Sequence, residues 1–109
     1  VQLFGGDIIG GTEGLQKILR QQVGGESRRA AEEGRSARTG PQPINTSGGL
    51  KSKGHPVGAT GTSQIIEVWN QLRNQAGDRQ IPNRNLRIGA AHNLGGTGGT
   101  CTFTILERR

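Results

Sequence analysis

The sequence predicts a small domain of the α/β class, in which a helix packs on two neighbouring strands. Apolar residues recur at helical spacing between Thr60 and Gln75, which indicates an amphipathic helix. Residues 86–91 and 100–106 have the apolar and alternating patterns of strands, and a glycine-rich turn joins them. A helix that is followed by such a pair is expected to cover one face of the sheet that the pair forms.

The chain before this unit divides into two parts. Residues 1–22 form an N-terminal segment with a short helix, which Thr12 can cap and which runs through Gln22, because apolar side chains recur within it at Leu15, Ile18 and Leu19. Residues 23–43 form a polar loop over the surface, since this stretch contains several glycines and prolines, at Gly24, Gly25, Gly34, Gly40, Pro41 and Pro43.

Residues 44–109 form the core of the domain, and their most regular element is the helix. It begins at Thr60 or Gly61 and ends at Asn74 or Gln75, because Gly77 follows and glycine is common just after a helix. We expect its inward face to carry apolar side chains, namely Ile65, Val68, Trp69 and Leu72. We expect polar side chains to point outward, namely Gln64, Glu67, Gln71 and Arg73.

Two strands follow the helix. The first covers 86–91 and ends at His92, and residues 93–99 turn the chain back into the second. In that second strand the side chains alternate, with Cys101, Phe103 and Ile105 on one face and threonines on the other. A free cysteine inside a strand usually packs as a small apolar group, so we expect Cys101 to be buried rather than nucleophilic.

The composition predicts a thin core and excludes several classes of protein. Only 29% of the 109 residues are hydrophobic and 20 are glycine, so we expect stabilisation by a partner chain or a second domain. No run approaches about 20 apolar residues, and the first residues lack the pattern of a secretory signal, which favours a cytoplasmic protein without a membrane span. One cysteine and two histidines exclude a disulfide framework and a structural zinc site, and we predict no metal site.

The net charge of +6 is compatible with nucleic-acid binding, but the pattern argues against it. Glutamates interrupt the arginines of the polar loop, and aromatic residues make up only 3% of the chain, so few rings can stack on bases. No nucleic-acid-binding motif occurs. We therefore predict no nucleic-acid partner, although a basic surface also attracts a small ligand that carries phosphate.

Two histidines stand beside glycine-rich turns and are the candidate catalytic groups. His55 lies between Gly54 and Pro56 just before the helix, where it can act as a base or donate a hydrogen bond to a carbonyl oxygen. Taken alone, such a histidine is more often a structural hydrogen-bonding group. His92 lies where a strand meets a second glycine-rich turn, and strand ends of this kind often carry chemistry. Since the two histidines flank one helix, they can converge on a shared pocket.

Two motifs resemble the C-terminal region of thiolases, in particular the sterol-carrier-protein-type and archaeal-type branch with its lipid-transfer-protein aldolases. They are residues 45–61 (NTSGGLKSKGHPVGATG) and residues 92–99 (HNLGGTGG). The resemblance covers residues 41–109, about two-thirds of the chain, and extends plausibly over residues 23–40. It implies the C-terminal half of a thiolase-like fold, with helices packed on a mixed sheet.

The resemblance also implies roles for particular residues. His55 corresponds to the histidine that activates the acyl-carrying cysteine and helps to hold a thioester oxygen. His92 stands at the position of the second cysteine of many thiolases, which acts as acid and base. Backbone amides of the turn contribute an oxyanion hole, here at Leu94, Gly95 and Gly96. The substrate loop corresponds to Asn45, Ser47, Gly48, Gly49 and Gly54.

The chain departs from the family pattern in two ways. Residues 2–7 lack the Asn-Glu or His-Asp motif that family members carry near the start of this region. The acyl-carrying cysteine of the family belongs to an N-terminal half that these 109 residues do not contain, and Cys101 matches neither family cysteine. A complete thiolase site therefore needs another half or a companion chain.

The resemblance implies the C-terminal part of an acyl-CoA C-acyltransferase, which carries out Claisen condensation or thiolysis. The alternatives are a retro-aldolase on a CoA-linked, steroid-type side chain and a non-catalytic subunit that binds acyl-CoA. We expect coenzyme A only as part of the substrate, and no other cofactor. The expected partners are acyl-CoA, the N-terminal half or a companion chain, a second copy in a homodimer, and a zinc-ribbon/OB-fold acyl-CoA-binding protein.

Overall fold

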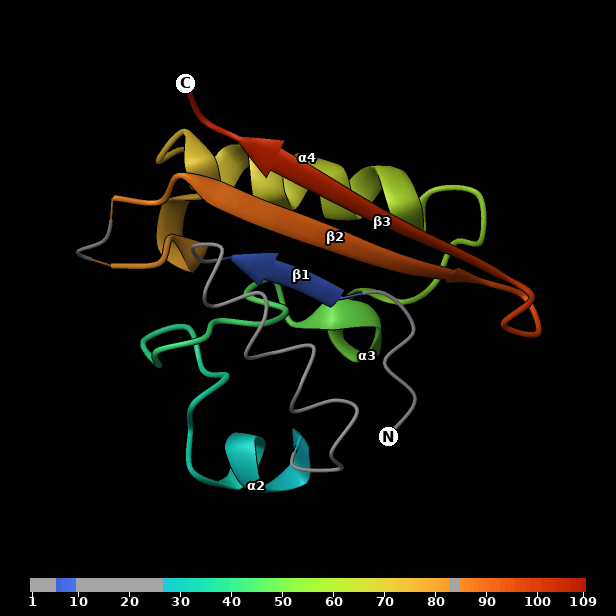
Figure 1. Ribbon diagram of the computed structural model, residues 1–109, viewed down its shortest axis with the longest axis horizontal. Coiled ribbons are helices and arrows are strands. Elements are labelled where there is room, and N and C mark those ends of the chain that lie inside the picture. The colour runs from blue at the N-terminus through green and yellow to red at the C-terminus, as the bar shows by residue number, and fades with distance from the viewer. Residues whose placement is uncertain (1–5, 10–26, 83–84) are drawn as a thin grey trace.

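The computed structural model describes residues 6–9, 27–82 and 85–109. Its elements are, in chain order, β1 (Gly6–Ile9), α2 (Ser27–Glu32), α3 (Gly49–Lys53), α4 (Thr60–Leu72), a short 3-10 helix η1 (Gly77–Arg79), β2 (Ile88–Gly95) and β3 (Thr100–Glu107). Helix α4 runs along the sheet and contacts all three strands (Figure 1). The predicted α/β arrangement, a helix on two neighbouring strands, is confirmed.

The sheet is antiparallel over the described strands, with the order β1-β2-β3. Strand β2 is central, and within it His92 pairs with Gly6 on one side and with Phe103 on the other. The described strands thus form an antiparallel sheet instead of the mixed sheet that the resemblance implies, and β1 is an additional strand. The helix expected within residues 1–22 lies outside the described residues.

Strand β2 is longer than predicted. It does not end at His92, because the ladder to β3 continues through Asn93, Leu94 and Gly95. The chain reverses only at residues 96–99, where Gly96 and Gly98 have φ angles of 48° and 87° and the Gly98 N–H donates to the Gly95 carbonyl over 2.9 Å. Glycine suits these two positions because side-chain-bearing residues rarely adopt positive φ.

The core lies between α4 and the sheet. Val68 and Leu72 from the helix pack with a group from the loops and strands, namely Ile81, Leu86, Ala91 and the half-buried Leu106. Ala90 points to the opposite face of β2, where Ile44 and Ile88 pack against it. Both faces of β2 are therefore covered by apolar side chains.

Helix α4 does not bury the face that its pattern predicted. Val68 and Leu72 are buried as expected, but Ile65 and Trp69 are 39% and 50% exposed. The side chains that face the protein interior include polar ones that had been placed outside, namely Gln64, Glu67 and Gln71. The expectation failed because α4 carries apolar residues on two sides, and the spacing alone does not tell which side meets the sheet.

The buried polar side chains of α4 are paired, and the pairs hold two loops against the helix. Gln71 donates from Nε2 to the Arg79 carbonyl over 2.7 Å and accepts at Oε1 from the Ile81 N–H over 3.0 Å. Glu67 accepts from the Thr46 hydroxyl over 3.2 Å and forms an ion pair of 3.1 Å with Arg79. A buried polar group costs stability unless it is paired in this way.

The polar loop at 23–43 is more structured than predicted over its described residues. Residues Ser27–Glu32 form α2, within which Ala30 is buried, and Pro43 is buried at the end of the segment. None of the helices in the described part of the chain has the length and apolar character needed to cross a membrane.

The ion pair at Glu67 can be tested by a double-mutant cycle. Arg79→Met leaves a carboxylate that is only 5% exposed without its guanidinium, so we expect the free energy of unfolding to fall by about 2 kcal/mol. Glu67→Gln in the Arg79→Met background should recover part of this loss, because the amide carries no charge. Urea unfolding of the four proteins measures the coupling. Additive losses would contradict a contribution from the pair.

Candidate functional site

The His55 imidazole is held by the first turn of α4. Its Nδ1 lies 2.7 Å from the Thr60 hydroxyl, and the side chain is otherwise exposed. The hydroxyl also lies 3.2 Å from the Pro56 carbonyl, and both contacts are hydrogen bonds when its single hydrogen goes to that carbonyl and His55 Nδ1–H donates to the hydroxyl. This assignment places a hydrogen on Nδ1 and leaves the Nε2 lone pair free to take a proton.

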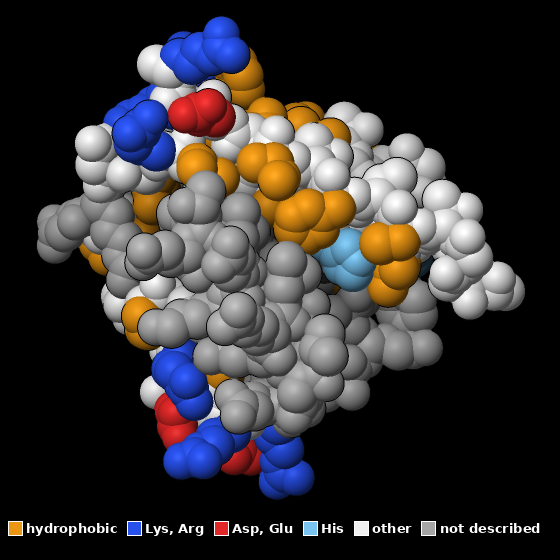
Figure 2. Space-filling view, in the orientation of Figure 1, with side chains coloured by type: hydrophobic (Ala, Val, Ile, Leu, Met, Phe, Trp, Pro, Cys, Tyr) orange, Lys and Arg blue, Asp and Glu red, His pale blue; other side chains and the backbone are white. Residues whose placement is uncertain are grey.

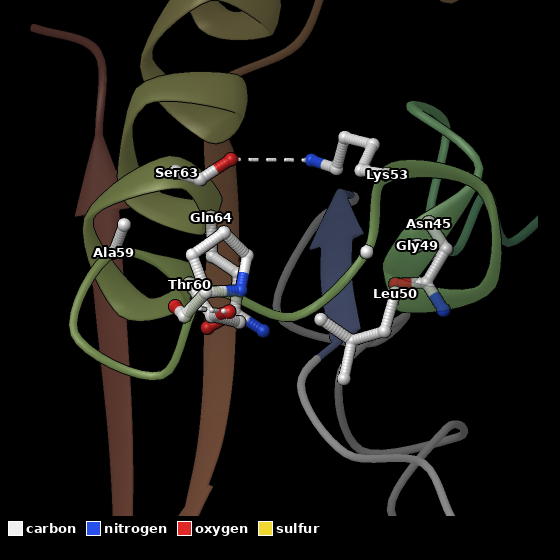
Figure 3. Close-up of a pocket in the computed structure, with 10 residues that line it drawn as sticks. Asn45, Gly49, Leu50, Lys53, Ala59, Thr60, Ser63 and Gln64 are labelled. Carbon is white, nitrogen blue, oxygen red and sulfur yellow. Dashed lines mark hydrogen bonds between the residues drawn. The ribbon is translucent and has the colours of Figure 1, made fainter.

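A pocket of about 270 Å³ lies between α3 and the first turns of α4. Figure 3 shows side chains from both helices facing it, with the Lys53 ammonium donating to the Ser63 hydroxyl over 3.3 Å. The lining is formed by Asn45, Gly49, Leu50, Lys53, Gly54, Pro56, Ala59, Thr60, Ser63 and Gln64. Three of the five predicted substrate-loop residues, Asn45, Gly49 and Gly54, are among them.

The other two predicted loop residues lie next to the pocket. Gly48 has a φ of 93°, and a Cβ there would lie 2.5 Å from the Ser52 Cβ, so only glycine fits. Ser47 is partly buried, and its hydroxyl has no hydrogen-bond partner among the described residues. The Ser-Gly-Gly sequence at residues 47–49 therefore forms a tight turn that leads into α3.

The His92 imidazole lies on the sheet face opposite α4. Its Nε2 is 3.1 Å from the Cys101 thiol on β3, and its ring centroid is 6.0 Å from that of Phe103. Figure 2 shows a histidine among hydrophobic side chains on the face of the sheet turned toward the viewer. Leu94 is half-buried in β2, whereas Gly95 and Gly96 are exposed at the hairpin end.

The expectation that Cys101 is buried was wrong. The thiol is exposed in this chain and pairs with an imidazole. Alternation assigned the correct face of β3 to Cys101, but that face is not fully covered, since Phe103 and Ile105 are also exposed there. An exposed thiol within hydrogen-bond distance of an imidazole is a candidate nucleophile or proton donor.

The segments that carry the two histidines both contact the first half of α4. Thr60 contacts His55, and one turn later Gln64 donates to the His92 carbonyl over 3.2 Å. Neither imidazole is among the residues that line the 270 Å³ pocket, so their action in one pocket stays a prediction.

Sequence reasoning missed Thr60 and Gln64 as members of this region. The four-residue spacing of Thr60 and Gln64 places them on one helix face, and Gly61 between them lets that face approach a strand closely. The apolar spacing of Ile65, Val68 and Leu72 is the stronger pattern, and it predicts that a different face of the helix is buried.

Thr60→Val tests how His55 is held. The change keeps the side-chain shape but removes the hydroxyl, so we expect the side-chain ¹⁵N spectrum of His55 to lose its bias toward the Nδ1–H form. Stability should fall by about 1 kcal/mol because a partly buried hydrogen bond is lost. Thr62→Val is the matched control, because Thr62 is exposed on the same turn of α4. Identical His55 spectra in both variants would contradict the assignment.

The sequence of this chain is similar to those of known proteins. The family model described as "Thiolase C-terminal domain-like" matches residues 19–108. An acetyl-CoA acetyltransferase of Methanothermobacter thermautotrophicus is 51% identical over 84 residues, which cover 77% of this chain and 21% of that protein. Human sterol carrier protein 2 is 43% identical over 83 residues, which cover 76% of this chain and 15% of that protein. No solved structure gives a significant match.

The chain spans only about a fifth, or less, of the length of these relatives. The family model nevertheless covers most of the chain and includes both histidine motifs. The suspected branch is also confirmed, because archaeal acetyl-CoA acetyltransferases and sterol carrier protein 2 are both among the relatives. This chain belongs to the thiolase family, as a C-terminal domain-like segment.

Proposed function

We propose that this chain is the C-terminal part of an acyl-CoA C-acyltransferase that makes or cleaves a carbon–carbon bond next to a thioester. The observation that carries the proposal is the His55 imidazole, held at Nδ1 by Thr60 with Nε2 free beside a pocket. The name acetyl-CoA acetyltransferase, borne by relatives up to 51% identical, supports the same chemistry.

In the proposed acyl transfer, a cysteine thiol from the N-terminal half gives its proton to His55 Nε2. The resulting thiolate attacks the thioester carbonyl of an acyl-CoA, and the CoA thiolate leaves and takes up the proton. The acyl group is then bound to the cysteine sulfur. We assign the base of this step to His55, because in the tautomer whose Nδ1–H donates to Thr60 the Nε2 of this exposed side chain can accept the proton.

In the proposed condensation, a base removes a proton from the carbon next to the thioester of a second acyl-CoA, and the carbanion attacks the carbonyl carbon of the acyl-cysteine. The bond between that carbon and the cysteine sulfur then breaks, and the cysteine leaves as a thiolate that takes up the proton. We assign this acid and base role to His92, with Cys101 3.1 Å from its Nε2. We assign stabilisation of the negative oxygen that develops to a backbone amide at this end of β2, at Leu94, Gly95 or Gly96. Coenzyme A enters as part of the substrate, and the proposal needs no other cofactor.

The exposed apolar side of α4 supports the need for another half of the protein. Ile65, Ile66 and Trp69 are 39%, 53% and 50% exposed along one side of the helix. A helix that is apolar on two sides is typical of a layer between other layers. We propose that the N-terminal half or a companion chain covers this side, and that a homodimer mate and a zinc-ribbon/OB-fold acyl-CoA-binding protein are further partners.

A second candidate function is retro-aldol cleavage of a CoA-linked side chain. It is favoured by the names of lipid-related relatives, such as "Non-specific lipid-transfer protein-like 2" of Caenorhabditis elegans, 56% identical over 52 residues. This reaction needs a base and an oxyanion pocket but no acyl-cysteine. A subunit that binds acyl-CoA without turnover is the third outcome of the experiments below.

Replacing the two histidines tests the proposed roles in the complete protein. We expect His55→Asn and His92→Asn each to lower kcat for condensation of acetyl-CoA by about 10²- to 10⁴-fold, as is typical for loss of a general base. Acyl-CoA binding, measured by calorimetry, should change little. Unchanged kcat in either variant would contradict the role of that residue.

Thiol alkylation separates acyl transfer from the aldol reaction. Because Cys101 is itself exposed, the experiment uses the Cys101→Ser variant, so that iodoacetamide reports on cysteines outside this chain. Under the acyltransferase proposal we expect alkylation to abolish turnover and pre-incubation with acyl-CoA to protect. Turnover that survives complete alkylation supports the retro-aldolase, and binding without turnover in the untreated protein supports the non-catalytic subunit.

A further inference from the structure

A buried glutamine on α4 joins this helix to the strand that carries His92. Gln64 is 5% exposed. Its Nε2 donates to the His92 carbonyl oxygen over 3.2 Å, and its Oε1 accepts from the Asn93 side-chain Nδ2 over 3.1 Å. A buried amide is unfavourable unless both of its ends are paired, so these two bonds fix Gln64 and two successive residues of β2 against each other.

The Asn93 side chain lies against the helix at Gly61. Gly61 precedes Gln64 by three residues and lies on the same face of α4. A Cβ at Gly61 would lie 2.9 Å from the Asn93 side-chain Nδ2, which is closer than side-chain carbons approach. The glycine therefore leaves room for the Asn93 side chain in the position from which it donates to Gln64.

The same face of α4 also holds the other histidine. Thr60 lies one turn before Gln64, is 6% exposed, and binds His55 Nδ1 over 2.7 Å. The chain of contacts from one imidazole to the backbone of the other thus runs through two side chains on one helical turn. A rigid helical turn transmits position more precisely than a loop.

We propose that Gln64 is a positioning residue that sets the place of the His92 imidazole relative to His55. The ladders to β1 and β3 fix His92 within the sheet, and Gln64 fixes its main chain relative to α4. The His92 ring, 3.1 Å from Cys101 and next to Phe103, moves with that main chain. The effect on turnover rests on the function proposed above, whereas the effect on His92 itself does not.

The test uses the complete protein with Gln64→Met, which keeps the length of the side chain and removes both hydrogen bonds. Leu72→Ala is the matched control, because Leu72 is 4% exposed in the core at the far end of α4. The first readout is kcat and KM for acyl-CoA at a temperature where both variants are folded. The second is the side-chain ¹H and ¹⁵N shifts of His92, assigned by their loss in His92→Asn.

We expect Gln64→Met to lower kcat by about tenfold or more, with KM within about twofold, because displaced catalytic groups lose rate rather than affinity. The His92 side-chain shifts should change. Leu72→Ala should lower the melting temperature at least as much, with kcat and the His92 shifts unchanged.

Two results overturn the inference. One is an equal loss of kcat in both variants, and the other is a set of His92 shifts that Gln64→Met does not alter. A wild-type protein without turnover would contradict the proposed function instead, and the His92 shifts would still decide whether Gln64 positions this residue.

Discussion

The structure depends on the pairing of the polar side chains that α4 buries. Thr60, Gln64, Glu67 and Gln71 lie on the inward side of the helix, where each unpaired donor or acceptor would cost stability. Their partners come from segments far apart in the sequence, including the His55 loop, the Thr46 loop, the Arg79 turn and the His92 strand. The hydrogen bonds that pair the buried polar groups of α4 therefore also hold these four segments against the helix. The small apolar core of Val68 and Leu72 with its neighbours completes the contact with the sheet.

This constraint explains how a chain with so few apolar residues places its candidate catalytic groups. The two histidine-bearing segments are joined by hydrogen bonds to adjacent turns of one helix, through Thr60 and Gln64, and β2 is held in addition by apolar packing at Ala90 and Ala91. Directed hydrogen bonds fix orientation, which an imidazole needs if it is to accept a proton at a defined nitrogen. The apolar side of the same helix, at Ile65 and Trp69, is left open. The chain thus combines a hydrogen-bonded side that faces its own sheet with an apolar side that is suited to packing against more protein.

The sequence was sufficient for the main elements and for the family. The helix at Thr60, the strand at Thr100 and the glycine turn were predicted because period, turn residues and alternation agreed. The family assignment followed from two dense motifs. The burial of Gln64 and Gln71 could not be predicted, because their partners are backbone groups whose positions depend on the tertiary fold. The exposure of Cys101 was missed for a related reason, since alternation assigns a face but not what covers it. Strand β1 was missed because it has only four residues and lies between the glycine pairs at 5–6 and 10–11.

The central claim is that His55 and His92 serve one reaction centre, held in place by α4. A crystal structure of the complete protein with a bound acyl-CoA tests it most directly. The account predicts that the thioester lies within hydrogen-bond reach of both imidazoles, about 3 Å or one bridging water away, with the Gln64 bonds intact. A thioester bound next to only one imidazole, or in a cavity formed by other parts of the protein, would contradict it.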